Sequence, residues 1–157
     1  MSPAINQAVL LLGSNIAPLQ NLPAILQALR TVYTLRSKSD VYESLPVGGE
    51  GGHYLNLAVE IECADTYAIL RDHLKEIETS LGRIRSEDRN APRTADIDII
   101  LFNHRIMDQK LLEMAFISIP VAQLYPDLIV PTPENNLASL ASRLARSTWL
   151  HKVDISF

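Results

Sequence analysis

The sequence contains little sulfur and no long apolar segment. Its single cysteine, Cys63, cannot form a disulfide within the chain, and one thiol excludes a metal site built from several cysteines. No segment approaches the ~20 consecutive apolar residues that cross a membrane. The apolar run at 8–12 is also too short for the core of a signal peptide. We therefore expect a protein of the reducing cytoplasm with no membrane partner.

Positive charge is in the minority. The 157 residues include 14 Lys and Arg against 18 Asp and Glu, which gives a formal net charge of −4. Domains whose surface serves a nucleic-acid backbone are usually strongly basic, so we expect no nucleic-acid partner. A small anionic ligand stays open, because such a ligand needs only local positive charge.

The glycine-rich phosphate loops of common nucleotide-binding folds are absent. Neither Gly-x-x-x-x-Gly-Lys-Ser/Thr nor Gly-x-Gly-x-x-Gly occurs, which leaves P-loop and Rossmann sites unsupported. Hydrophobic residues make up 47% of the chain, a normal proportion for a globular protein with a real core. The length fits one ordinary domain, so we expect a single domain over 1–157. No heptad pattern indicates an oligomeric state.

Strand and helix patterns follow one another along the chain. Strands are predicted at 8–12, 39–47, 54–62 and 96–102, and helices at 19–33 and 67–81, the second capped by Asp65. This is the βαββαβ order of ferredoxin-like α+β folds. It predicts a mainly antiparallel sheet with helices on one face and the other face free for ligands. Weaker signals indicate helices at 121–125 and 137–144 and a last strand at 149–155.

The most informative stretch combines clustered arginines with a pair of aspartates. Four arginines fall within eleven positions, at Arg83, Arg85, Arg89 and Arg93. Asp96 and Asp98 follow on a predicted strand, where residues i and i+2 share one face about 6.5–7 Å apart. Paired carboxylates suit Mg²⁺, and guanidinium groups suit phosphate oxygens. The stretch predicts a polyphosphate site, although a solvated strand face beside a salt-bridged loop stays open.

The residues at 89–100 also form a longer pattern: basic residue, spacer, small residue, Pro, Arg, two spacers, Asp, aliphatic, Asp and two aliphatics. This pattern resembles the signature of the 6-hydroxymethyl-7,8-dihydropterin pyrophosphokinase family. The segments at 12–15, 54–56 and 81–85 are similar to that family as well. The resemblance implies transfer of pyrophosphate from ATP to the hydroxymethyl group of a reduced pterin in folate biosynthesis, with release of AMP.

The resemblance further implies roles for individual residues. Asp96 and Asp98 would hold two Mg²⁺ ions against the ATP phosphates, and the catalytic arginines would be Arg83, Arg85 and Arg93. The pterin would be bound by Ser44, Val47, Tyr54, Asn56 and Phe116. The nucleotide would be bound by Glu78, Arg85, Arg93 and Ile99. Without the resemblance, Tyr54, Asn56 and Glu78 are more typical of structural or solvated positions.

One segment departs from the family pattern. At 111–116 the chain is shorter than its family counterpart and lacks the His and Arg that serve the nucleotide phosphates there. His104 and Arg105 are near in sequence, but the end of a strand is a poor place from which to replace them. An alternative is therefore a diverged, non-catalytic paralogue that binds pterin or nucleotide as a sensor or partner protein. An RNA-binding domain ranks far behind, because adjacent exposed aromatic residues are missing from the predicted sheet.

Overall fold

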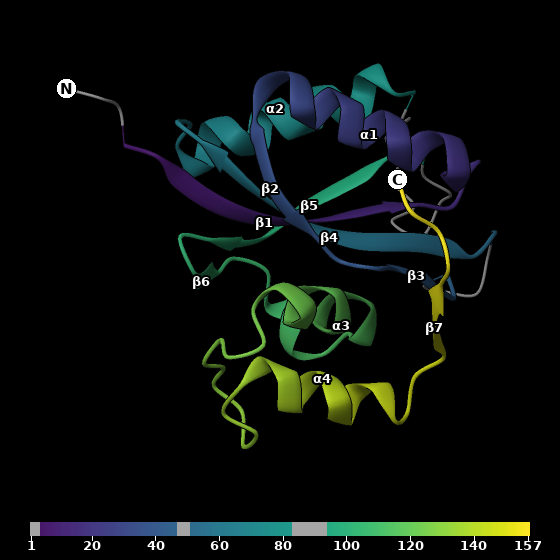
Figure 1. Cartoon of the computed structure of the whole chain (residues 1–157), viewed down its shortest axis with the longest axis vertical. Helices are drawn as coiled ribbons and strands as arrows, with labels where there is room; N and C mark the ends of the chain where they lie inside the picture. Colours follow the sequence, from purple (N-terminus) through teal and green to yellow (C-terminus); the bar gives the residue numbers. More distant parts are fainter. Residues whose placement is uncertain (1–3, 47–50, 83–93) are drawn as a thin grey trace.

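The computed structural model describes residues 4–46, 51–82 and 94–157, which form a seven-stranded sheet with helices on both faces (Figure 1). The strands are β1 (Asn6–Ser14), β2 (Thr34–Lys38), β3 (Val41–Ser44), β4 (Tyr54–Cys63), β5 (Asp96–Phe102), β6 (Arg105–Ile106) and β7 (Leu150–Val153). The helices are α1 (Pro18–Val32), α2 (Tyr67–Ser80), α3 (Ala115–Leu124) and α4 (Leu137–Ala145), with a short 3₁₀ turn, η1 (Gln109–Leu112). The strand order is β6-β5-β1-β4-β3-β7, and β2 also pairs with β4.

The predicted βαββαβ core is confirmed, with antiparallel pairing throughout it. β1 lies at its centre, between β4 and β5. The alternating apolar residues of β1 and β4 turn one set of side chains toward α1 and α2. These two helices supply apolar side chains at spacings of three and four, and the large ones that are fully buried are Leu22, Ile25, Leu26, Leu29, Leu70 and Leu74.

The two helices of the predicted core, α1 and α2, lie on one face of the sheet as expected, but the expectation that the second face is free for ligands is wrong. Val9, Leu11 and Ala58 turn to this face and pack in a second core with Ile117 and Val121. α3 covers the sheet there, and α4 packs on the outside of α3 (Figure 1). Apolar residues surround most of the α3 axis, as in a helix that is buried between two layers. Such a helix has little amphipathic signal, which is why the sequence pattern revealed only its last residues.

Two local features differ from the sequence prediction. β2 was not predicted, because its sequence TLRSK alternates between exposed and half-buried positions at the side of β4 and carries little apolar pattern. α2 is capped by Thr66, whose side chain accepts a hydrogen bond from the Ile69 amide at 3.3 Å. Asp65 is not the cap. Its carboxylate has other partners.

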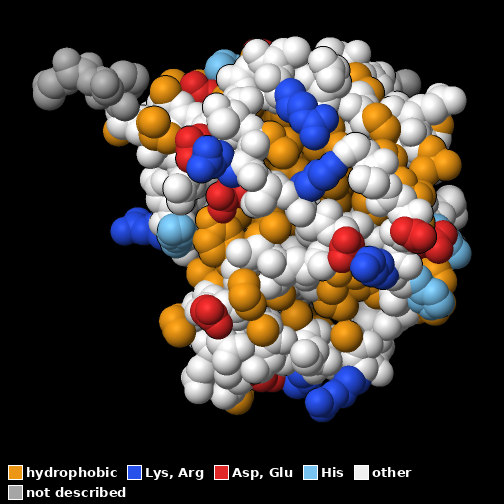
Figure 2. All heavy atoms as spheres, viewed as in Figure 1, with side chains coloured by type: hydrophobic (Ala, Val, Ile, Leu, Met, Phe, Trp, Pro, Cys, Tyr) orange, Lys and Arg blue, Asp and Glu red, His pale blue; other side chains and the backbone are white. Residues whose placement is uncertain are grey.

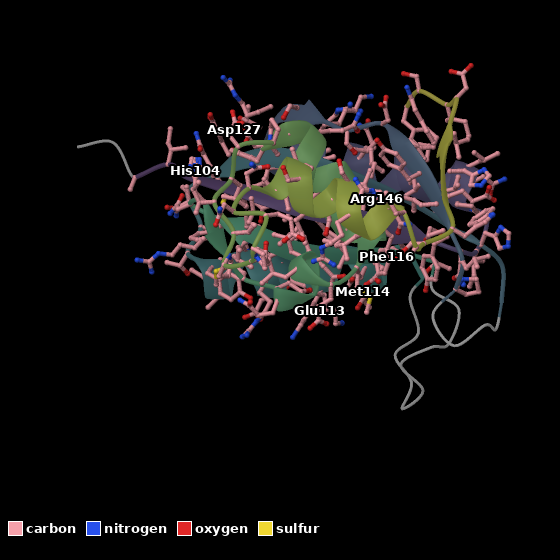
Figure 3. The ribbon with its side chains drawn as sticks, turned by 90° about the horizontal axis from the view of Figure 1, so that it is seen from below. His104, Glu113, Met114, Phe116, Asp127 and Arg146 are labelled. Carbon is pink, nitrogen blue, oxygen red and sulfur yellow. The ribbon has the colours of Figure 1, made fainter. Side chains whose placement is uncertain are left out.

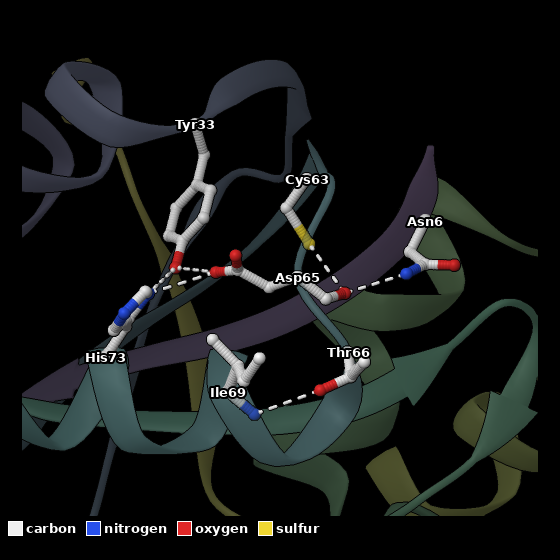
Figure 4. Close-up of polar contacts among 7 residues, drawn as sticks. All are labelled: Asn6, Tyr33, Cys63, Asp65, Thr66, Ile69 and His73. Carbon is white, nitrogen blue, oxygen red and sulfur yellow. Dashed lines mark hydrogen bonds and ion pairs between the residues drawn. The ribbon is translucent and has the colours of Figure 1, made fainter. Parts of the chain in front are cut away.

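Asp65 is the centre of a polar cluster with Tyr33 and His73 (Figure 4). The Tyr33 hydroxyl donates to Asp65 Oδ2 at 2.8 Å, and Nδ1 of His73 lies 3.0 Å from the same oxygen. Burial, together with the hydrogen bond to this carboxylate, raises the pKa of Tyr33. The Asn6 side chain donates to the Asp65 backbone carbonyl at 2.7 Å. The cluster therefore ties the end of α1 and the start of β1 to α2.

The surface is mixed in charge. On the face shown in Figure 2, acidic and basic side chains are scattered among apolar and uncharged ones and do not gather into one patch. Among the residues that the structure describes, every helix is too short or too polar to cross a bilayer.

Candidate active site

Asp96 and Asp98 open β5 on the face opposite to α1 and α2. Ile97 and Ile99, which alternate with them, are buried in the core beneath those helices. The structure therefore bears out the prediction that both carboxylates share one face. Asp96 pairs with Gly13 and Asp98 with Leu11 across β1, so the pair lies at one end of the central strand.

A recess of about 280 Å³ lies beside this end of β5. Its lining comes from α2, from the start of β5 and from the segment after β6: Tyr67, Arg71, Leu74, Lys75, Glu78, Asp96, Ile97, Asp98, Ile99, Met107 and Asp108. β6 pairs with β5 only at Leu101 and Phe102, so none of the described strands covers the outer edge of β5 near the aspartates. Side chains of α2 reach this edge. Glu78, which is 3% exposed, accepts a hydrogen bond from the Ile97 amide at 2.8 Å.

Like charges converge in this recess. Protein atoms limit the hydration of the Asp98 carboxylate, and together with the carboxylates of Asp96, Asp108 and Glu78 they raise the pKa of Asp98 to about 7. Lys110 acts in the opposite direction. The Asp98 side chain nevertheless keeps an exposed side toward solvent. A divalent cation can therefore reach it, and would relieve the repulsion between the carboxylates.

The predicted pterin residues Ser44, Tyr54 and Asn56 lie on the same face of the sheet as the aspartates. Ser44 pairs with Tyr54 across β3 and β4, and the Asn56 amide donates to the Ser44 hydroxyl at 2.8 Å. Ser44 and Asn56 are both buried, so this hydrogen bond fixes the orientation of the amide. Phe116 lies on α3, which covers this face, and it is half-buried against the second core.

Figure 3 separates two groups of side chains at this side of the molecule. Glu113, Met114 and Phe116 lie together, whereas His104 lies far from them. The His104 ring packs edge-on against Tyr125, with 5.3 Å between the ring centroids. His104 is therefore not in a position to replace a histidine of the 111–116 segment.

That segment has a structural role in this chain. Leu111 is completely buried and Ala115 almost so, and both belong to the packing around η1 and α3. The positively charged side chains that line the recess belong to α2 and are those of Arg71 and Lys75. These two residues were missed by the sequence interpretation. Their spacing of four, with Glu78 three further on, is a signal that they share one helix face.

Four predicted site residues, Val47, Arg83, Arg85 and Arg93, lie outside the described residues. Within the described parts of the chain, no three His, Cys, Asp or Glu side chains converge closely enough to hold a metal ion by themselves. A cation at Asp96 and Asp98 would therefore complete its coordination with oxygens of a ligand or water, as Mg²⁺ commonly does.

Comparison with known proteins decides the family. Residues 9–126 match the family model for 7,8-dihydro-6-hydroxymethylpterin-pyrophosphokinase (HPPK). The chain belongs to the HPPK family. The match includes most of β1, both aspartates and the whole of the 111–116 segment. The family expected from residues 89–100 is thus confirmed.

Curated HPPK relatives are similar over most of their length. A 2-amino-4-hydroxy-6-hydroxymethyldihydropteridine pyrophosphokinase of Bacillus subtilis is 35% identical over 147 residues, covering 90% of this chain and 84% of the relative. An enzyme of the same name from Pseudomonas aeruginosa is 32% identical over 139 residues, covering 81% of this chain and 85% of the relative.

A solved structure supports the HPPK fold. The crystal structure of wild-type Plasmodium falciparum HPPK-DHPS superposes with a TM-score of 0.73 over 89% of this chain, at 13% sequence identity. This chain spans only 41% of that longer protein. At such low identity the likeness supports the fold alone.

Proposed function

We propose that this chain transfers pyrophosphate from ATP to the hydroxymethyl group of 6-hydroxymethyl-7,8-dihydropterin, with release of AMP, as a step of folate biosynthesis. The observation that carries the proposal is that the aspartates and the predicted pterin residues lie on the same face of the sheet, in a member of the HPPK family. Asp96 and Asp98 lie at one side of this face, and the buried pair Asn56 and Ser44 lies at the other. Such a face can hold a phosphate donor and a heterocyclic acceptor next to each other.

The aspartates fit Mg²⁺. They are two hard oxygen donors in a recess where neighbouring carboxylates already disfavour further negative charge. In this proposal Asp96 and Asp98 hold two Mg²⁺ ions together with ATP oxygens. When bound, Mg²⁺ neutralises charge on the phosphates and helps to orient the group that is transferred.

The side chains around the recess have different proposed roles in binding the nucleotide. Arg71 and Lys75 lie where they can attract the phosphates or keep the nucleotide in the recess. Glu78 holds the Ile97 amide and with it the backbone between the two aspartates. Ile99 contributes an apolar wall. Arg83, Arg85 and Arg93 are proposed from the sequence alone to stabilise charge on the transferred group.

At the proposed pterin end, Ser44 and Asn56 are more deeply buried than the two aspartates. Asn56 and Ser44 offer an oriented amide and a hydroxyl for the polar edge of the ring. Tyr54 on β4 and Phe116 on α3 are the aromatic residues proposed to line the pocket, and Val47 is proposed from the sequence to contribute its backbone. Holding both substrates in fixed positions is the main contribution that such a site makes to phosphoryl transfer.

The proposal is tested by incubating the protein with Mg²⁺, ATP and reduced hydroxymethylpterin and separating the products. We expect AMP and the pterin pyrophosphate in equal amounts, and no product when a chelator removes Mg²⁺. Formation of ADP would overturn the pyrophosphoryl assignment. Pterin binding without any nucleotide product would instead support a non-catalytic binding protein, the reading that the absence of His and Arg from 111–116 favours.

A further inference from the structure

Gly13 occupies the position on β1 where the two halves of the site meet. It pairs with Asn56 on β4 at one side and with Asp96 on β5 at the other. Directly paired residues point to the same face of a sheet. Asn56 and Asp96 therefore project on either side of a residue that has no side chain. The two residues are two strand spacings apart, roughly 10 Å.

The backbone does not require glycine at this position. Positive φ angles among the described glycines occur at Gly51 and Gly82, not at Gly13. What matters is space, because a Cβ atom on Gly13 would lie 2.9 Å from Asn56 Oδ1. It would also lie 3.6 Å from Cδ1 of Tyr54. The first distance is shorter than a normal carbon–oxygen contact, so the amide or the strand would have to move.

Asn56 cannot move away without a cost. Its side chain is 3% exposed, and its amide nitrogen donates to the Ser44 hydroxyl at 2.8 Å. A rotation that clears the new methyl group would break this buried hydrogen bond or leave the amide badly aligned. The absence of a side chain on Gly13 thus allows the Asn56 amide to keep its present position and orientation.

We propose that Gly13 is a positioning residue for the pterin. Its bare backbone keeps the Asn56 amide in the orientation that Ser44 anchors, and it leaves the floor of the site open between Asn56 and Asp96. This inference rests on the proposed function for the identity of the ligand. The contact between Gly13 and Asn56 itself does not depend on that function.

The test compares Gly13→Ala with the wild type in binding of the reduced pterin, with MgATP analogue present. We expect the pterin Kd to rise at least tenfold while the Kd for the MgATP analogue stays within twofold. In the ligand-free protein, the side-chain amide signals of Asn56 in an NMR spectrum should shift. A wild-type pterin Kd with unshifted Asn56 signals would overturn the proposal, as would an equal loss of affinity for both ligands.

A second variant separates positioning from general damage. Asn56→Ser shortens the side chain and removes the atom that the new methyl group would meet. Adding Gly13→Ala to Asn56→Ser should therefore cause no further loss of pterin affinity, and this comparison stands even if Gly13→Ala alone does not fold. A further loss, or failure of only the double variant to fold, would show that the methyl group collides with something else and would overturn the proposal.

The wild-type measurements keep this test distinct from the proposed function. If the wild type binds no pterin, the proposed function fails. The NMR shift of the Asn56 amide still reports whether Gly13 sets its position.

Discussion

Asp65 follows the end of β4 and Asp98 lies within β5, and the fold surrounds these two acidic residues in opposite ways. The Asp65 carboxylate accepts a hydrogen bond from Tyr33 and lies 3.0 Å from a ring nitrogen of His73 (Figure 4). Asp98 faces other carboxylates, those of Asp96, Asp108 and Glu78, and its pKa rises to about 7. One acid is satisfied by the protein, whereas the other sits in an electrostatic environment that the protein alone leaves unfavourable.

This difference separates a structural carboxylate from a functional one. The Asp65 cluster joins three elements and needs no ligand to be stable. In the Asp98 recess, repulsion between neighbouring carboxylates opposes folding. Such an arrangement is typical of sites that bind a cation or carry out chemistry. The contrast predicts that changes in the two regions affect different measurements.

The largest effect is expected from Asp98→Asn. The substitution removes a proposed Mg²⁺ ligand, so kcat/KM should fall by roughly 100-fold or more, as for loss of other charge-stabilising groups. Because folding raises the pKa of Asp98, ionisation of this carboxylate weakens stability as the pH rises toward 7. Above pH 7, the free energy of unfolding of Asp98→Asn should therefore not be lower than that of the wild type.

The matched control for this prediction is Asp127→Asn, which changes an exposed aspartate on the α3–α4 connection. It should leave both turnover and stability as they are. Unfolding of Asp98→Asn at the wild-type assay temperature would contradict a functional role and indicate that Asp98 is structural.

Asp65→Ala should reverse this pattern. Loss of the carboxylate removes the charged acceptor of the half-buried Tyr33 hydroxyl, which keeps only the ring nitrogen Nδ1 of His73 at 3.1 Å, and should lower the free energy of unfolding by about 1–2 kcal/mol. The KM values for ATP and pterin should not change, because the cluster lies outside the recess. Denaturant unfolding and steady-state kinetics measure the two quantities. A large change in KM with intact stability would break the comparison.

Arg71→Gln tests whether α2 supplies the charge that the 111–116 segment lacks. Because the Arg71 side chain is 53% exposed, its electrostatic contribution is modest, about 0.2–1 kcal/mol. The KM for ATP should rise up to about fivefold, with the pterin KM unchanged. Arg36→Gln, in an exposed ion pair with Glu62, is the matched control. Equal effects of both variants would show that net charge alone matters.

The smallest effect concerns the recess without ligands. Asp96→Asn removes one neighbouring negative charge, so the pKa of Asp98 should fall below about 7. A carboxyl NMR titration of metal-free protein measures it. An unchanged pKa would mean that limited hydration, the larger cause, accounts for nearly the whole shift.

Much of the fold was predictable because its patterns are local. The strand at 54–62 alternates cleanly, and the aspartates alternate with Ile97 and Ile99, so their faces followed from a period of two. The burial of α3 did not follow, because a helix that is apolar on most sides has no preferred face. A shift in the pairing of β1 with β5 at Val9 and Leu10 was equally hidden. It turns both Ile100 and Leu101 toward the second core.

The site was predictable where a motif is continuous and hidden where it is assembled. Asp96 and Asp98 stand in one short pattern with the arginines before them. Arg71 and Lys75 are ordinary surface residues of a helix until α2 lies against the edge of β5. Glu78 was expected at the nucleotide. Its hydrogen bond to the Ile97 amide, 19 positions further along the chain, is a property of the fold.

By itself, the sequence determined the family signature, the βαββαβ core and the shared face of the two aspartates, since each depends on residues that are close in the chain. Only the tertiary structure decided which distant residues meet. The pairing of Gly13 with both Asn56 and Asp96 is set by strand register across the sheet. Register depends on the fit of whole strands and helices, and no local pattern records it.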